Sequence, residues 1–175
     1  MTRLFEKGWR AKRGRSGPSI VLLGALGLGL WSGCGDSPAP ETTDAGLLYS
    51  CAMETRAVPY MANLTLASTS GGFTAVLVES VPGPPAKGTN AWTVKILDAG
   101  GAPQDGLTIT GAANMPDHRH PATVKPVVTP VDGSAGTYSV TPVYLFMPGY
   151  WEVTLTLQPA GGTKDTVVFP VCIPG

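Results

Sequence analysis

The chain has few charged residues, and their distribution excludes one class of function. Only 14% of its 175 residues are charged, and the twelve basic residues equal the twelve acidic residues in number. Six of the basic residues lie within the first fifteen positions, so the part that follows Cys34 has six basic and eleven acidic residues, a net charge of −5. A mildly acidic segment without a basic stripe does not favour nucleic-acid binding.

The sequence also lacks the motifs of common catalytic and nucleotide-binding sites. No Gly-x-Ser-x-Gly turn is present to expose a nucleophilic serine. No glycine-rich loop ends in the lysine of a phosphate-binding site. Four aspartates in glycine-containing turns are too scattered for a calcium loop: Asp98, Asp105, Asp132 and Asp165. We therefore expect a protein that is not an enzyme.

No apolar run is long enough for a membrane-spanning helix. The run at 20–31 has about a dozen residues, whereas a spanning helix needs about 20. A basic leader precedes it, and the small residues Ser32 and Gly33 follow it. This arrangement predicts a cleaved secretory signal over residues 1–33, with a permanent anchor helix as the alternative.

The end of that segment resembles the bacterial lipoprotein signal, whose box is Leu, a small residue, Gly or Ala, and then Cys. The sequence has Trp31-Ser32-Gly33-Cys34, with Trp where Leu is usual. The resemblance implies cleavage before Cys34, acylation of its thiol and attachment to an envelope membrane, facing the periplasm. Gly35 after the cysteine favours the outer membrane. Residues 34–50 are predicted to be the lipidated Cys and a flexible tether, because their composition cannot form a core.

Three cysteines are an unusual number for a secreted protein. If Cys34 is acylated, Cys51 and Cys172 remain as one pair at opposite ends of the predicted domain, residues 51–175. We predict a disulfide between them, because an oxidising envelope favours disulfides. Two unrelated buried thiols are the alternative.

Glycine and proline are abundant, with 23 and 17 residues, and 43% of the chain is hydrophobic. This composition favours short strands joined by turns around a core. Polar and apolar residues alternate at 91–97 and 150–157, as half-buried antiparallel strands require. We predict an all-β, immunoglobulin-like antiparallel β-sandwich of seven or eight strands, with a barrel as the alternative. The expected strands are 63–68, 73–79, 91–97, 107–113, 123–131, 137–145, 150–157 and 165–172.

Both histidines lie in one short segment, which begins with a Met-Pro pair, and a second Met-Pro pair follows at 147–148. On an extended segment the two histidines would point the same way. Imidazole and thioether donors together suit copper, and the soft sulfur favours Cu(I). If the two Met-Pro turns meet at one end of the sandwich, the predicted copper ligands are Met115, His118, His120 and Met147. The alternative is a rigid polar loop in which the methionines only fill gaps in the core.

A further set of motifs extends this pattern: Asn90-Ala91-Trp92, Gly101-Ala102-Pro103, Met115-Pro116-x-His118-x-His120, Gly136-x-Tyr138 and Phe146-Met147-Pro148-Gly149-x-Trp151. With them, residues 88–171 resemble the YtkA-like domain family, which is related to the FixH-like family. The resemblance implies a small envelope β-sandwich, with some members linked to metal transport and respiratory-oxidase assembly. We expect a non-catalytic binding module that holds or passes on copper. The alternative is a metal-free interaction module, accessory to a transporter or a respiratory assembly and bound to an envelope protein partner.

Overall fold

The structure is a computed structural model, and it describes residues 49–175. The predicted signal at 1–33, the lipidation site Cys34 and nearly all of the tether lie outside the described residues. None of the helices within 49–175 is long and apolar enough to cross a membrane.

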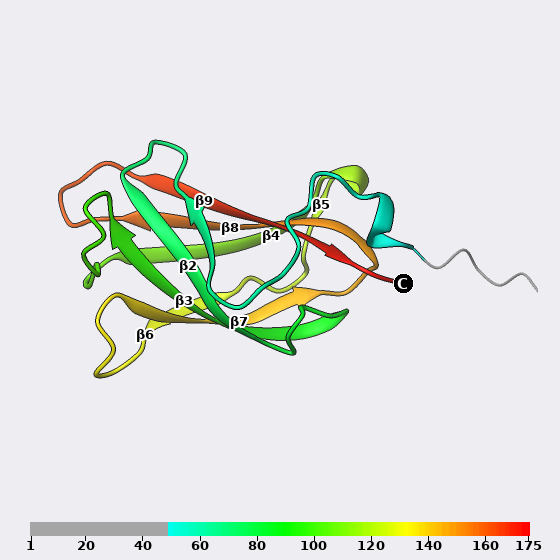
Figure 1. The fold of residues 1–175 in the computed structure, drawn as a ribbon, viewed down its shortest axis with the longest axis horizontal. Helices are drawn as coiled ribbons and strands as arrows, with labels where there is room; N and C mark the ends of the chain where they lie inside the picture. Colours follow the sequence, from blue (N-terminus) through cyan, green and yellow to red (C-terminus); the bar gives the residue numbers. More distant parts are fainter. Residues whose placement is uncertain (1–48) are drawn as a thin grey trace, which may run out of the picture. The chain divides into compact units, whose positions relative to one another are not determined.

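The described residues form two antiparallel sheets (Figure 1). The five-stranded sheet has the order β1-β2-β3-β7-β6. Its strands are β1 (Leu64–Ala67), β2 (Phe73–Val81), β3 (Gly88–Asp98), β6 (Val127–Pro130) and β7 (Thr137–Leu145). The four-stranded sheet has the order β5-β4-β8-β9. Its strands are β4 (Thr108–Met115), β5 (His120–Pro121), β8 (Gly149–Gln158) and β9 (Asp165–Ile173).

The strand orders follow the immunoglobulin pattern. The order β2-β3-β7-β6 corresponds to strands A, B, E and D, and the order β4-β8-β9 corresponds to strands C, F and G. Strand β5 pairs with β4 in the place of strand C′, and β1 adds a further edge beside β2. The prediction of an all-β, immunoglobulin-like sandwich is confirmed.

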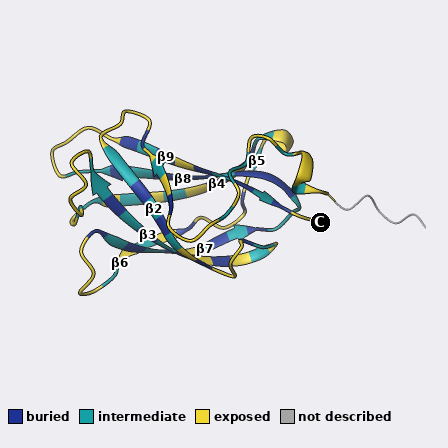
Figure 2. Cartoon of the chain, in the orientation of Figure 1, coloured by how far each residue is buried: buried dark blue, intermediate teal, exposed yellow. Residues whose placement is uncertain are grey.

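The core lies between the two sheets, where the inward-facing residues of the two sheets meet (Figure 2). Trp92, Val94 and Ile96 of β3 are at most 1% exposed, and so are Trp151, Val153, Leu155 and Leu157 of β8. Trp92 also contacts Phe169 of β9 edge to face, with ring centroids 5.6 Å apart. The period-two alternation therefore identified both faces of these strands correctly.

All eight predicted strands are present; the strand at 137–145 has the predicted ends, and the other seven have changed ends. The largest change is at 123–131, where only Val127–Pro130 pairs with β7. The ninth strand, β5, was not predicted. It has only two residues, too few to show an alternating pattern.

The predicted disulfide is confirmed. Cys51 and Cys172 are bonded, with their Cα atoms 5.8 Å apart. Cys51 begins a short 3₁₀ turn, η1 (Cys51–Met53), and Cys172 lies near the end of β9. The bond therefore attaches the segment before the first strand to the edge of the four-stranded sheet.

Candidate metal centre

The histidine segment lies in the connection between β4 and β5. Strand β4 ends at Met115, and a 3₁₀ turn, η2 (Pro116–His118), follows. Arg119 then adopts a left-handed conformation with φ 56°, and β5 begins at His120. The expectation that both histidines lie on one extended segment is therefore wrong. Proline fixes its own φ near the helical value and so favours the 3₁₀ turn.

The two imidazole rings nevertheless lie close together. Their centroids are 5.7 Å apart, and the ring planes are tilted by 53°. His118 is exposed, whereas His120 is half-buried and stacks on Phe146, with centroids 5.5 Å apart. Trp151 meets the His120 ring edge-on at 6.4 Å. Two aromatic residues thus fix the orientation of one imidazole of the pair.

One ring nitrogen of His120 lies within hydrogen-bond distance of a backbone carbonyl. Its Nδ1 lies 3.3 Å from the carbonyl oxygen of Pro121. If Nδ1 carries the proton and donates it to that carbonyl, Nε2 keeps its lone pair. Metal-binding histidines commonly donate their other N–H to a backbone carbonyl in this way.

Met115 and the segment around Gly149, which follows the second Met-Pro pair, approach each other at this end of the sandwich. Met115 pairs with His120 across β4 and β5. Its side chain is only 1% exposed, and its Cε methyl occupies the space in which a side chain at Gly149 would begin. Met147, two residues before Gly149, is half-buried and packs against the core. The indole Nε1 of Trp151 donates a hydrogen bond of 3.0 Å to the carbonyl of Met147. All four predicted ligands therefore lie on neighbouring elements.

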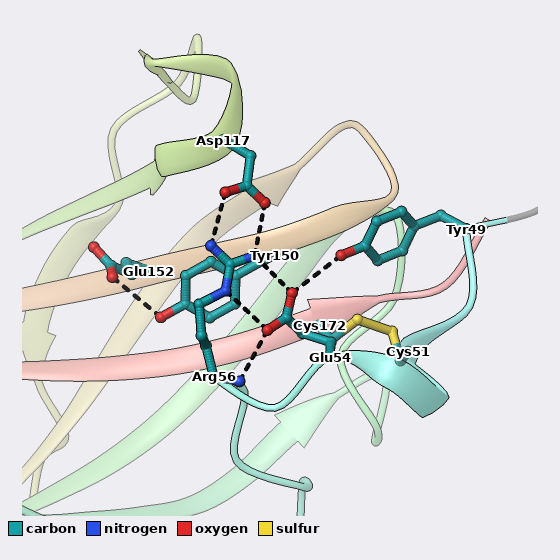
Figure 3. A network of polar contacts seen from close by, with 8 residues as sticks. All are labelled: Tyr49, Cys51, Glu54, Arg56, Asp117, Tyr150, Glu152 and Cys172. Atoms are coloured by element: carbon teal, nitrogen blue, oxygen red, sulfur yellow. Dashed lines mark hydrogen bonds and ion pairs between the residues drawn. A yellow bond between two sulfur atoms is a disulfide. The ribbon is translucent and has the colours of Figure 1, made fainter.

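An ion-pair network beside the loop was not predicted (Figure 3). The guanidinium of Arg56 donates two hydrogen bonds of 2.7 Å to the two carboxylate oxygens of Asp117, the residue before His118. It also donates to Glu54 from Nε at 2.9 Å and from Nη2 at 2.7 Å. The same guanidinium lies over the ring of Tyr150, with its carbon 4.1 Å from the ring centre.

The charges of this network stabilise each other. Hydrogen bonds from Arg56 lower the pKa of Glu54 to about 2 and also lower the pKa of Asp117. Hydrogen bonds to Asp117 and Glu54 raise the pKa of Arg56. Burial, together with the hydrogen bond of 3.1 Å that its hydroxyl donates to Glu152, raises the pKa of Tyr150 to about 12. All four groups therefore keep their neutral-pH protonation states over a wide pH range.

The ligands predicted from the sequence, His118, His120, Met115 and Met147, are imidazole and thioether groups. Within residues 49–175, no group of three or more His, Cys, Asp or Glu side chains is arranged to hold a metal ion. Nitrogen and soft sulfur together suit copper better than the oxygen-preferring magnesium or calcium.

The comparisons with known proteins identify the family. The model of the YtkA-like family matches residues 68–156, about half of the chain. The chain belongs to the YtkA-like family. The match begins twenty residues before the 88–171 range of the sequence resemblance and ends fifteen residues before the end of that range. The matched part of this YtkA-like domain contains all four candidate ligands and neither disulfide cysteine. The search of curated proteins and the search of solved structures found no match.

Proposed function

We propose that this YtkA-like protein is a non-catalytic copper-binding module of the bacterial envelope. His118 and His120 supply the imidazole ligands of a Cu(I) ion, and Met115 and Met147 supply thioether ligands. The module holds the ion or passes it on to an envelope partner.

The spacing of the two imidazoles carries this proposal. With metal–nitrogen bonds of about 2.0 Å, two imidazoles on one ion have ring centres roughly 5 to 6 Å apart. The centroids of His118 and His120 are 5.7 Å apart. The half-buried Met147 and the buried Met115 lie on the elements next to this pair, which supports a site that combines nitrogen and sulfur.

Copper titration tests the proposal. We would use the full chain with Cys34→Ser in every variant, so that the Cys34 thiol cannot bind copper, and measure Cu(I) affinity by competition with a chromophoric chelator. We expect His118→Ala/His120→Ala to abolish tight binding. We expect Met147→Leu, which keeps the volume and removes the sulfur, to weaken it. If the double histidine variant binds Cu(I) as tightly as the parent, the proposed function is wrong.

The chain offers matched controls for the sulfur ligands. Met53 and Met61 are 86% and 62% exposed and lie outside the candidate site. Met53→Leu/Met61→Leu therefore removes two thioethers without touching the imidazole pair. We expect this variant to bind Cu(I) like the parent, and an equal loss of affinity would show that exposed methionines bind the copper.

We also propose that the module is tethered to the envelope by lipid on Cys34, facing the periplasm, with the outer membrane favoured. The Cys51–Cys172 disulfide supports this location, because disulfides form and persist in oxidising compartments. Radiolabelled fatty acid should be incorporated into the parent and not into Cys34→Ser. Equal labelling of both would contradict the proposal.

A second candidate function is a metal-free interaction module for a transporter or respiratory assembly. The burial of Met115 favours it, because a residue that is 1% exposed is accounted for by core packing alone. This function predicts a co-purifying envelope protein that remains bound after chelation. It also predicts that His118→Ala/His120→Ala leaves that binding unchanged.

A further inference from the structure

The segment before the first strand is attached to the domain at a few points. The Cys51–Cys172 disulfide joins it to β9. The amide of Gly175 donates a hydrogen bond of 2.9 Å to the carbonyl of Tyr49, and the amide of Val58 donates one of 3.0 Å to the carbonyl of Pro170. This segment is therefore held along β9 by the disulfide at one end and at the other by Val58, whose side chain also packs against the core.

Between these attachment points, contacts with Glu54 orient the Arg56 side chain toward Asp117. Its backbone amide and its side chain both donate to Glu54, at distances of 2.7 to 2.9 Å. The Glu54 side chain is only 7% exposed, and it also accepts a hydrogen bond of 3.2 Å from the Tyr49 hydroxyl. The ring of Tyr150 supports the guanidinium from β8 (Figure 3). The fork of N–H groups that faces Asp117 is therefore fixed in direction.

The loop that Arg56 contacts is otherwise weakly held. The η2 turn has no buried residue and no side-chain cap, and its closing hydrogen bond runs from the Arg119 amide to the Pro116 carbonyl at 3.2 Å. Among the described residues, the two hydrogen bonds from Arg56 to Asp117 are the only side-chain hydrogen bonds that join residues 116–119 to another segment. A bidentate pair fixes geometry as well as distance, so Arg56 fixes the turn that carries His118.

We infer that Arg56 is a positioning residue for the copper site and that the Cys51–Cys172 disulfide holds it in place. Opening the disulfide releases the segment around Arg56, frees the η2 turn and lowers the affinity for Cu(I). This inference rests on the proposed copper-binding function.

The redox step is ordinary thiol–disulfide exchange with a dithiol reductant. One thiolate of the reductant attacks a sulfur of the Cys51–Cys172 bond and forms a mixed disulfide. Its second thiol then displaces the protein sulfur. The reductant becomes a disulfide. Its two electrons and two protons reduce Cys51 and Cys172 to thiols.

The test compares four variants, and one combination of two of them, with the parent, all as the full chain with Cys34→Ser. Arg56→Gln removes the charge and the bidentate fork. Arg56→Lys keeps the charge but cannot donate two parallel bonds. Cys51→Ser/Cys172→Ser mimics the opened disulfide without adding thiols that bind Cu(I). Lys125→Gln is the control, because Lys125 is exposed and makes no ion pair with the described residues.

We expect Arg56→Gln to weaken Cu(I) binding about tenfold, as loss of a residue that orients metal ligands commonly does. Arg56→Lys should recover less than half of this loss on a logarithmic scale. The serine pair should weaken binding to a similar extent. Adding Arg56→Gln to the serine pair should cause little further loss, because both changes remove the same contact.

The imidazole NMR signals of the copper-free protein provide a second measurement that does not depend on binding. The His118 signals should shift in Arg56→Gln and in the serine pair, and should stay unchanged in Lys125→Gln. If the parent binds Cu(I) and Arg56→Gln binds it equally tightly with unshifted His118 signals, the inference is wrong and the proposed function stands. If the parent binds no Cu(I), the proposed function fails, and the inference fails with it. If the serine pair does not fold, Arg56→Gln and Arg56→Lys still decide the inference.

Discussion

Replacing Gly149 by alanine tests how the buried methionine of the site is positioned. Gly149 begins β8 with φ 133°, a conformation that side chains rarely adopt. A Cβ atom there would overlap the Cε methyl of Met115, which is 1% exposed and cannot swing into solvent without opening the core. The substitution therefore adds backbone strain and displaces Met115.

The two costs can be estimated separately. Strain at a glycine-only backbone position costs about 1 to 3 kcal/mol. Overpacking a filled core costs about 1 to 3 kcal/mol more. We expect Gly149→Ala to lower the free energy of unfolding by about 2 to 6 kcal/mol. Gly161→Ala is the control for strain alone, because Gly161 has φ 69° and nothing lies within 4 Å of its added Cβ.

Urea denaturation of a double-mutant cycle separates the overlap from the strain. Met115→Ala should cost about 2 to 5 kcal/mol by itself. It also removes the methyl that the new Cβ of Gly149→Ala would overlap. The double variant should therefore lose about 1 to 3 kcal/mol less unfolding free energy than the two single variants lose together. If the two losses add to within about 0.5 kcal/mol, the two residues are not in contact and this reasoning is refuted. If Met115 also binds copper, Gly149→Ala should weaken Cu(I) binding, whereas Gly161→Ala should not.

Three further predictions concern the rest of the domain. Cys51→Ser/Cys172→Ser opens a loop with a sequence separation of 121 residues and should lower the free energy of unfolding by about 5 kcal/mol in the chain-entropy model. Urea denaturation would measure this loss against the oxidised parent. Because the pKa of Glu54 is lowered from 4.5 to about 2, its charge should stabilise the fold above pH 4.5, and this contribution should disappear as the pH falls through about 2. Across this pH range, the urea midpoint should decline more steeply for the parent than for Glu54→Gln. The fully buried Asn90 amide accepts from the Ala86 amide and donates to the carbonyls of Ala86 and Gly88, so Asn90→Ala should cost at least about 2 kcal/mol in thermal or urea unfolding, and a smaller loss would mean that water replaces these bonds.

The sandwich was predictable because its signal is local. Alternation along β3 and β8 identifies which side chains face the core, and each strand contains enough residues to repeat the pattern. Turn residues between the strands gave their approximate ends. The disulfide was predictable for a different reason, since only one pairing is left once Cys34 is set aside.

The local shape of the histidine loop was not predictable from spacing alone. An extended segment and a 3₁₀ turn can both bring residues two apart into proximity, and the difference here depends on Pro116 and on the left-handed Arg119. Arginine has no special preference for that conformation, whereas glycine and asparagine do. Pro116 favours the turn, but no residue in the sequence marks the left-handed position at 119.

The Arg56–Asp117 pair is a second feature that could not be predicted from the sequence. The two residues are 61 positions apart, and neither lies on a patterned strand. Their meeting depends on the path of residues 49–58 along β9, which the Cys51–Cys172 bond and the Val58–Pro170 hydrogen bond set. A prediction of the disulfide could have raised the question of what else this segment contacts, because the bond places Arg56 only five residues from a fixed point on β9.

The arrangement separates the rigid and the adjustable parts of the candidate site. Met115 and the aromatic residues around His120 belong to strands and the core, so they keep their positions whenever the sandwich is folded. His118 lies on a turn with no buried residue, and its nearest side-chain attachment to another segment is through Asp117 to Arg56. A change in the oxidation state of Cys51 and Cys172 would therefore move one imidazole relative to the other while the core stays intact. Under the proposed copper-binding function, one ligand would then be regulated without unfolding the domain that carries it.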